Sequence, residues 1–337
     1  SSLIVTQFVI ACIMISCTFI IYRQFKFLQN ADLGINKEYV ISIPLKKPLE
    51  GRDLIQKLRS HLSSNPAILS ITDSSINIGL GLDKSSSKMT NGFGYKDGQI
   101  NANMAFVDYD YLKTFGIKII EGKDMDVSIA ADTLKHVIVT ESVAKQFKEK
   151  QLVGMDILVD SAAAAWHIEA IIPDFHLYSL REAKEPLTLV LDKTSPVSYC
   201  FIKTNAQNKV AVMESVKSEM ALLEPGREFK GSFIDDNLQQ LYKQEQIMSI
   251  VFSTAAGIAI VLSCMGLLAM VLLMIQQRVK EIGVRKVLGA SVPGISVLIS
   301  KDFLSLVLIA VLIATPVSWM AMNQWLQSCR PIWLSRP

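Results

Sequence analysis

The stretch Lys280-Glu281-Ile282-Gly283-Val284-Arg285-Lys286-Val287-Leu288-Gly289-Ala290-Ser291 lies between two long apolar runs. Residues 247–275 and residues 303–322 contain no Asp, Glu, Lys, Arg or His. Each run exceeds the roughly 18 apolar residues that mark a membrane-spanning helix. The quoted stretch is therefore predicted to be the short loop between two spans.

A third apolar run, residues 3–21, opens the chain, and a helix can satisfy its few polar side chains through its own backbone. Half of all residues are hydrophobic, yet 19% are charged. The charge must therefore lie mainly in the roughly 225 residues between the first and second spans, which are enough for a separate core. The sequence predicts a membrane protein, an α-helical transmembrane bundle of three spans with an inserted α+β extracytoplasmic domain.

The loop between the second and third spans indicates on which side of the membrane each part of the chain lies. Its basic residues mark it as cytoplasmic by the positive-inside rule, whereas a large domain crosses the membrane largely regardless of its charge. We therefore expect the large domain to be outside, which in a bacterium is the periplasmic face of the inner membrane. The basic residues are Arg278, Lys280, Arg285, Lys286 and Lys301.

Two classes of protein are disfavoured by composition. The net charge of +3 is small and evenly spread, and no basic run is interleaved with aromatic residues, so nucleic acid is not an expected partner. Of five cysteines, Cys200 alone lies in the predicted outer domain, so no disulfide framework is expected.

Short strands and helices alternate along the outer domain without a repeat, which predicts a mixed α+β fold. Asp108 is a candidate cap for a short helix that ends before Gly116, and the glycine-rich segment 79–98 reads as a mobile loop or flap. The other predicted helices are 53–62 and 208–223; the predicted strands are 40–43, 117–120, 137–140, 166–172, 187–191 and 197–203.

A continuous helix is predicted to leave the outer domain. From Asp236 the chain runs to Ile275 without proline, and without glycine before the second span. At 1.5 Å per residue such a helix is about 60 Å long, roughly twice the hydrocarbon thickness. We therefore expect a rigid stalk that joins the outer domain to the cytoplasmic loop.

The loop itself is predicted to be a short helix that ends at Gly289, before a new helix that starts with Ser291 and Pro293. If this segment served only as a basic anchor at the membrane surface, its basic residues alone would be enough. Glycine inside a helix costs about 1 kcal/mol relative to alanine unless close packing requires it. Gly283 therefore indicates that another surface approaches this helix closely.

The residues Glu281 to Ser291 resemble the E-I-G-I-R-K-x-x-G-A-S signature of the MacB/FtsX-like permease family of ABC transporters. The outer domain is also similar to the MacB-type periplasmic core domain, because the expected short motifs occur in the expected order. These motifs are Val107 to Tyr111, Gly116-Ile117, Glu121-Gly122, Val139 to Glu141 and Asp174-Phe175-His176.

The resemblance implies a permease subunit that transmits ATP-driven motion to a periplasmic domain. The sequence agrees, because no G-x-x-x-x-G-K-[ST] phosphate loop occurs in it, so we expect no catalytic residues, no cofactor, no metal, and an ABC ATPase as partner. By resemblance, the ATPase-coupling residues are Glu281, Ile282, Gly283, Arg285, Lys286, Leu288 and Gly289.

The chain also resembles the second half of a longer Bacteroidetes-type permease, with the fourth span of that half missing. The predicted parts are the first span 1–22, the outer domain 23–235, the stalk and second span 236–275, the coupling helix 276–291, the third span 292–327 and a non-family tail 328–337.

Small residues four apart in the second span predict close contact with another helix, such as one from a second permease half or subunit in a dimer. These residues are Ser253 with Gly257 and Ala255 with Ala259. Lipid contacts the spans, and a periplasmic adaptor or substrate protein is the remaining expected partner.

Two alternatives remain open. His167, Glu169, Asp174 and His176 fall within ten residues, as zinc ligands of an enzyme could, although the first two are expected on the solvent side of a strand. Spans that flank an α+β domain also occur in membrane sensors with a ligand-binding ectodomain. The sequence does not identify the substrate, whether a drug, a peptide or a lipoprotein.

Overall fold

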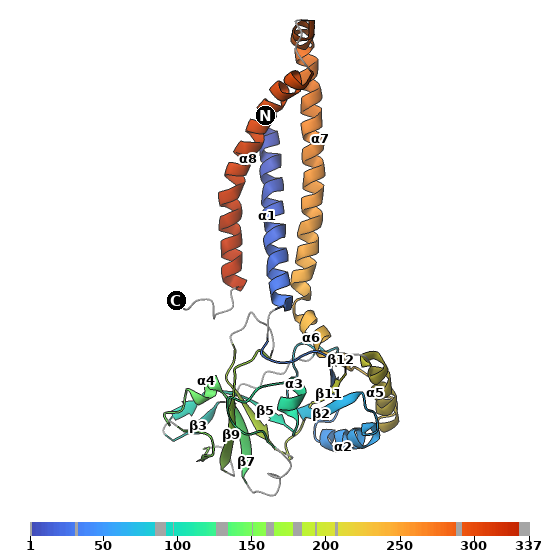
Figure 1. Cartoon of the computed structure of the whole chain (residues 1–337), viewed down its shortest axis with the longest axis vertical. Helices are drawn as coiled ribbons and strands as arrows, with labels where there is room; N and C mark the ends of the chain where they lie inside the picture. The colour runs from blue at the N-terminus through green and yellow to red at the C-terminus, as the bar shows by residue number, and fades with distance from the viewer. Residues whose placement is uncertain are drawn as a thin grey trace. The chain divides into compact units, whose positions relative to one another are not determined.

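The computed structural model describes residues 2–30, 33–84, 92–96, 98–125, 134–149, 151–159, 165–177, 184–192, 194–205, 208–287 and 292–329. The chain divides into two compact units (Figure 1). One is a helical unit made of α1 (Ser2–Asn30), α7 (Lys243–Val287) and α8 (Val292–Cys329). The other, which we call the outer domain, holds the elements from β1 to α6.

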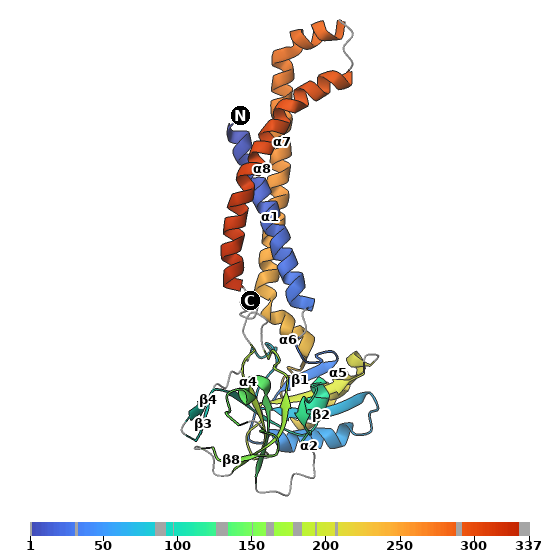
Figure 2. The same cartoon turned by 60° about the vertical axis from the view of Figure 1, so that its left-hand side comes forward.

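All three helices of the helical unit are long and apolar enough to cross a membrane, over Val5–Arg23, Gln246–Lys280 and Val307–Gln324. Helix α1 contacts both α7 and α8 (Figures 1 and 2). A small core lies between them, where Cys17, Ile21 and Met322 are buried beside Phe252. Most other apolar side chains of α7 and α8 are exposed and suit contact with lipid. The predicted transmembrane bundle with an inserted α+β domain is confirmed.

The outer domain contains a mixed sheet of ten described strands. Its main path runs β12-β1-β11-β2-β5-β10-β7-β9-β6, and β8 also pairs with β9. The pairs β5–β10 and β7–β9 are parallel and the others are antiparallel. The strands are β1 (Val40–Pro44), β2 (Ile68–Ser74), β5 (Asn103–Val107), β6 (Glu121–Gly122), β7 (Lys135–Thr140), β8 (Asp156–Ile157), β9 (Trp166–Ile172), β10 (Leu187–Leu191), β11 (Tyr199–Thr204) and β12 (Ser232–Phe233).

The remaining elements lie against this sheet or beside it. A separate hairpin is formed by β3 (Phe93–Tyr95) and β4 (Gly98–Ile100). The helices are α2 (Gly51–Leu62), α3 (Tyr111–Phe115), α4 (Glu141–Ala144), α5 (Lys209–Leu223) and α6 (Ile234–Leu241).

Two of the apolar clusters formed by the described residues define two lobes of the outer domain, and buried Tyr111 and Phe115 of α3, which follows β5, pack together with Phe201 of β11 and connect them. The first lobe contains β12, β1, β11 and β2, and α2 and α5 bury apolar side chains such as Leu58 and Val216 against Ile41 and Ile202. The second lobe contains β5, β10, β7, β9, β6 and the β3–β4 hairpin, which packs around Trp166. Each core follows from alternating apolar residues on strands and an apolar stripe on the covering helices.

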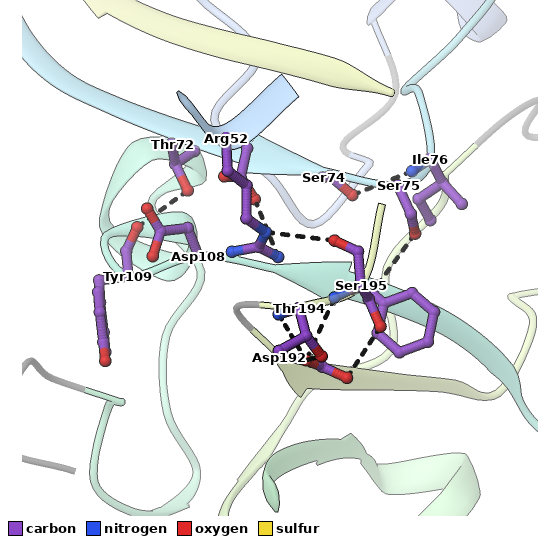
Figure 3. A network of polar contacts seen from close by, with 12 residues as sticks. Arg52, Thr72, Ser74, Ser75, Ile76, Asp108, Tyr109, Asp192, Thr194 and Ser195 are labelled. Atoms are coloured by element: carbon purple, nitrogen blue, oxygen red, sulfur yellow. Dashed lines mark hydrogen bonds and ion pairs between the residues drawn. The ribbon is translucent and has the colours of Figure 1, made fainter. Parts of the chain in front are cut away.

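The lobes meet where β2 pairs with β5. A single residue pair, Ser74 with Val107, joins these strands, whereas β11 pairs with β2 over six residues and β10 with β5 over five. The sheet is thus continuous here, and a hydrogen bond from Thr72 Oγ1 to the Tyr109 carbonyl, at 2.9 Å, adds to the contact between the lobes (Figure 3).

Three local predictions for the outer domain are wrong. Residues 117–120 do not form a strand, because the amide of Ile117 closes the end of α3 by donating to Leu112. Helix α3 is not capped by Asp108, whose carboxylate instead accepts a hydrogen bond from Arg59. The segment 79–98 is not one loop, since its end forms β3 and part of β4; residues 85–91 and 97 lie outside the described residues.

The predicted uninterrupted stalk from 236 to 275 is also wrong. Helix α6 ends at Leu241, Tyr242 forms a turn, and α7 starts at Lys243. The absence of glycine and proline permits a continuous helix but does not enforce one. Burial of Ile234 and Leu238 against the outer domain fixes the direction of α6, and the chain must turn to start the span.

Candidate functional site

The cytoplasmic segment that the sequence singles out is helical in the structure up to Val287. It is not a separate element, because α7 continues through it from the second span without a break. Figure 2 shows, however, that the last turns of α7 and the first turns of α8 turn away from the line of the long helices. Of the predicted coupling residues, Leu288 and Gly289 lie outside the described residues.

The described side chains at this end of α7 leave an open surface. Val284 is 61% exposed and Val287 is 89% exposed. Gly283 is exposed too, and a Cβ atom added to it would meet no described atom within 4 Å. Gly283 therefore packs closely against none of the residues that the structure describes. Glu281, Ile282, Arg285 and Lys286 lie in the same turns of helix.

At the other end of α7, a set of main-chain hydrogen bonds ties the two membrane-linked ends of the outer domain together. We call it the junction, made of Leu33, Gly79, Leu80, His176, Leu177 and Asn237. Leu33 follows α1, and Asn237 lies in α6, directly before α7. The two are linked through the segments 79–80 and 176–177.

Each step of the junction is one backbone bond. The amide of His176 donates to the Leu33 carbonyl at 2.9 Å, and the amide of Gly79 donates to the Leu177 carbonyl at 3.1 Å. The amide of Leu80 then donates to the Asn237 carbonyl at 3.0 Å. These three bonds therefore connect α6 to the segment that follows α1 through main-chain groups alone.

Gly79 is the residue on which this geometry depends. Its φ of +76° is one that L side chains rarely adopt, and an added Cβ would lie 2.9 Å from the Asn237 carbonyl carbon. The sequence predicted that Gly79 starts a mobile loop, but in the structure Gly79 lies against α6. A glycine before a polar loop is too common a signal to reveal this contact.

Buried polar side chains hold the two sides of the junction. Asn237 is 1% exposed and accepts a hydrogen bond from Ser232 Oγ at 2.6 Å. Asn77 is equally buried and accepts from Ser42 Oγ at 2.9 Å. Burial lowers the pKa of His176, with Lys184 adding to the effect, so its side chain is neutral at pH 7.

The small residues of the second span divide between two faces of α7. Ala255 and Ala259 are half-buried, whereas Ser253 and Gly257 are exposed. A Cβ at Gly257 would meet no described atom within 4 Å. Helix α7 does approach α1 closely at Gly266, where an added Cβ would lie 2.8 Å from Gln7 Oε1.

Replacing Gly266 with leucine should weaken the packing of α1 on α7, because the new side chain overlaps Gln7 and its polar end. Overpacking of this kind costs about 1–3 kcal/mol. Thermal unfolding of the helical unit in detergent, followed by circular dichroism, should show a lower transition temperature. Gly257→Leu is the matched control and should leave this transition unchanged; equal effects of the two variants would contradict the assignment of this contact.

The four residues considered as zinc ligands do not form one group; His167 Nε2 and Glu169 Oε1 lie 3.9 Å apart, and these are the two of the four that the structure brings near each other. Glu169 is buried at a bulge of β9 and accepts a hydrogen bond from His136 Nδ1 at 2.7 Å, so its predicted position on the solvent side is wrong. His167 bonds to Asp156, and Asp174 accepts from Ser142. Among the described residues no group of three His, Cys, Asp or Glu side chains is arranged to hold a metal ion.

Two comparisons with known proteins found sequences similar to this chain. Residues 253–335 match the model of the FtsX-like permease C-terminal family, a match that includes most of the segment predicted as a non-family tail. The chain is also similar to "Macrolide export ATP-binding/permease protein MacB" of Acinetobacter baylyi, with 24% identity over 205 residues. That alignment covers 58% of this chain and 31% of the relative, so the chain spans about a third of the curated relative that it matches.

Solved structures are also similar to part of the chain. The periplasmic region of MacB from Actinobacillus actinomycetemcomitans is 15% identical, with a TM-score of 0.45, over 62% of this chain and 94% of that one. A domain of a permease protein from Porphyromonas gingivalis is 12% identical, with a TM-score of 0.36, over 58% and 89%.

The family match covers the second and third spans together with the basic segment between them. With that segment cytoplasmic, the chain is a multi-pass protein of the bacterial inner membrane, and its outer domain is periplasmic. Its second and third spans thus match the FtsX-like permease C-terminal family, and the chain is similar to a MacB protein.

Proposed function

We propose that this permease carries ATP-driven motion from a partner ATPase across the membrane to its periplasmic domain. The observation that carries the proposal is α7, a single helix from Lys243, next to the junction, to Val287 in the basic segment. A helix resists bending over a few turns, so a push at one end displaces the other. That role requires no catalytic residue in this chain.

The coupling segment 276–291 is the proposed docking site of the ATPase. Exposed Gly283 leaves room for close approach, and exposed Val284 and Val287 offer apolar contact. The residues proposed to bind are Glu281, Ile282, Gly283, Arg285, Lys286, Leu288 and Gly289. The ATPase supplies hydrolysis, because the phosphate-loop pattern is absent from these 337 residues.

A second permease half is the proposed partner of the exposed face of α7 around Ser253 and Gly257. Both residues are small and exposed, which permits close approach of another helix. The periplasmic domain then acts on a substrate or on a periplasmic protein, by export, extraction or regulation.

Purification of the full chain from its native membrane in mild detergent tests the docking site. We expect an ATP-hydrolysing subunit to accompany the wild type, and Gly283→Trp to remove it because the indole fills the approach to the helix. Glu281→Lys should have the same effect by reversing a charge. The readout is ATP hydrolysis in the purified sample, with the subunit identified by mass spectrometry.

The matched control is Leu222→Trp, which adds the same side chain at a position that is 70% exposed on α5. This variant should retain the ATPase. If Gly283→Trp and Glu281→Lys both retain ATP hydrolysis at the wild-type level, the coupling segment is not where the ATPase docks.

A further inference from the structure

A cavity of about 140 Å³ lies in the first lobe, between β1, α5 and the segment that joins α5 to β12. Buried Ile43 and Met220 form its apolar floor, and Phe229, which packs on the core of this lobe, closes one side. An apolar cavity of about 150 Å³ in a protein can bind benzene. This cavity therefore has room for an apolar group of about six carbon atoms.

Small residues and a short strand keep this space open. Ala221 of α5 lines the cavity with only a methyl group, and the ring of Phe229 lies against Gly231, where an added Cβ would overlap it. Strand β12 pairs with β1 at Ile41 and Ser42 alone. Among the described residues, no strand therefore covers the end of β1 on the side of the cavity.

The rim of the cavity is basic. Lys217, Arg227 and Lys230 line it, and no acidic side chain of the described residues does. Arg227 is engaged within the chain, because its guanidinium donates to the Glu224 carboxylate and to the Pro44 carbonyl. The two lysines are therefore the cations that a ligand can use.

The present partners of these lysines hold them weakly. Lys217 Nζ lies 3.8 Å from Glu214 and Lys230 Nζ lies 3.5 Å from Glu228, and the four side chains are 45% to 81% exposed. Exposed ion pairs contribute about 0–1 kcal/mol, so a bound anion can replace these glutamates. Since each lysine keeps a glutamate nearby, the single charge of a carboxylate suits the site better than the nearly double charge of a phosphate monoester.

We propose that this cavity binds a small amphipathic carboxylate. Its apolar group enters between Met220 and Phe229, and its carboxylate accepts hydrogen bonds from Lys217 and Lys230. A free carboxylic acid and the last residue of a peptide both offer this chemistry. The inference goes beyond the proposed function, because it concerns a ligand of the outer domain, and its test needs no ATPase.

Phenylacetate, a benzene ring that carries one carboxylate, is the probe, titrated into the full chain in detergent at neutral pH. The readout is NMR of methionine methyl groups labelled with carbon-13, with the Met220 signal assigned through Met220→Leu. We expect this signal to move and to saturate, because the ring of the probe lies beside the Met220 methyl group. An unmoved Met220 signal would overturn the proposal.

The uncharged analogue phenylacetamide tests the role of the basic rim. It should bind at least about fivefold more weakly than phenylacetate, because it cannot replace the glutamates as partner of the lysines. The double variant Lys217→Gln, Lys230→Gln should weaken phenylacetate binding to a similar extent, whereas Lys57→Gln, which removes a charge on α2 outside the cavity, should not. Equal binding of the two compounds would show that the lysines recognise no carboxylate.

Ala221→Trp fills the cavity from an exposed position of α5, so the fold should persist while phenylacetate no longer moves the Met220 signal. Leu222→Trp is the matched control, because it adds the same side chain one residue away, at a position that does not line the cavity. This control should bind like the wild type. If both variants bind phenylacetate like the wild type, the probe occupies another place and the proposal is wrong.

A tripeptide of two glycines and a C-terminal phenylalanine separates the two sources of the ligand. Binding tighter than that of phenylacetate, and lost when the C-terminal carboxylate is amidated, would support the cavity as a site for the last residue of a peptide. Binding weaker than that of phenylacetate would support it as a site for a free acid.

Discussion

Replacing Gly79 with alanine should lower the free energy of unfolding of the outer domain by about 2–5 kcal/mol. The left-handed backbone costs an L residue roughly 1–2 kcal/mol, and forcing a methyl group against the Asn237 backbone adds about 1–3 kcal/mol. Urea unfolding followed by the fluorescence of Trp166, with the other tryptophans replaced by phenylalanine, measures this loss.

The same variant should also uncouple the two units, since Gly79 binds the Leu177 carbonyl and lies against α6. We expect the partner ATPase to remain bound. The ATP-dependent change in the distance between spin labels attached at Val210→Cys and Leu158→Cys, two exposed positions of the outer domain, should be lost. Gly122→Ala is the matched control, because Gly122 also has a positive φ and its added Cβ would overlap the Glu169 carbonyl, while Gly122 makes none of the hydrogen bonds of the junction.

Gly122→Ala should therefore destabilise the fold without removing the ATP-dependent movement, measured below its unfolding midpoint. If both glycine variants keep the movement, the backbone links of the junction do not carry the motion. If both lose it, the effect is one of stability alone.

Asp73→Asn should change the pH dependence of the stability of the outer domain strongly. Burial raises the pKa of Asp73 from 3.8 to about 7, against the opposing effect of Arg52. A carboxyl with a raised pKa binds its proton more tightly in the folded state. Its contribution is therefore most favourable below about pH 4 and is lost as the pH rises from about 4 to 7.

Since one pKa unit corresponds to about 1.4 kcal/mol, the loss amounts to about 4 kcal/mol by pH 8. The Asp73→Asn variant should resemble the wild type near pH 4 and be more stable at pH 8. Urea midpoints across this range give the result; parallel curves for the two proteins would show that Asp73 is ionised in the fold at an ordinary pKa.

Asp192→Asn supplies a control of opposite sign. Burial alone would raise the pKa of Asp192, but hydrogen bonds from Lys135, Thr194 and Ser195 hold it below its usual range. The stability that Asp192 contributes is present above the pKa of the unfolded chain and is lost on acidification. Its asparagine variant should therefore be less stable than the wild type at pH 8, where Asp73→Asn is more stable.

The membrane spans were predictable because their signal is local. Long runs without charge identify α7 and α8, and Gly116 with its positive φ ends α3 as predicted. Strands β9, β10 and β11 were found from their apolar and β-branched residues. Strands β2 and β5 were missed, because Ser70, Thr72, Asp73 and Ser74 make β2 read as a polar segment, although it lies in the middle of the sheet.

The junction and the cavity between β1 and α5 could not be predicted. Both depend on contacts between segments that are far apart in sequence, and the junction is made of amide and carbonyl groups that every residue carries. The family motif Asp174-Phe175-His176 indicated that this turn matters, but not that His176 and Leu177 bind Leu33 and Gly79.

Because the junction consists of main-chain bonds and one glycine, its hydrogen bonds do not use the side chains of Leu33, Leu80 or Leu177. Substitutions at Leu33, Leu80 or Leu177 that keep the backbone in place leave every hydrogen bond of the path available. Under the proposed function, the surface of the outer domain can therefore vary in sequence while the hydrogen bonds of the junction stay the same, provided that position 79 remains glycine.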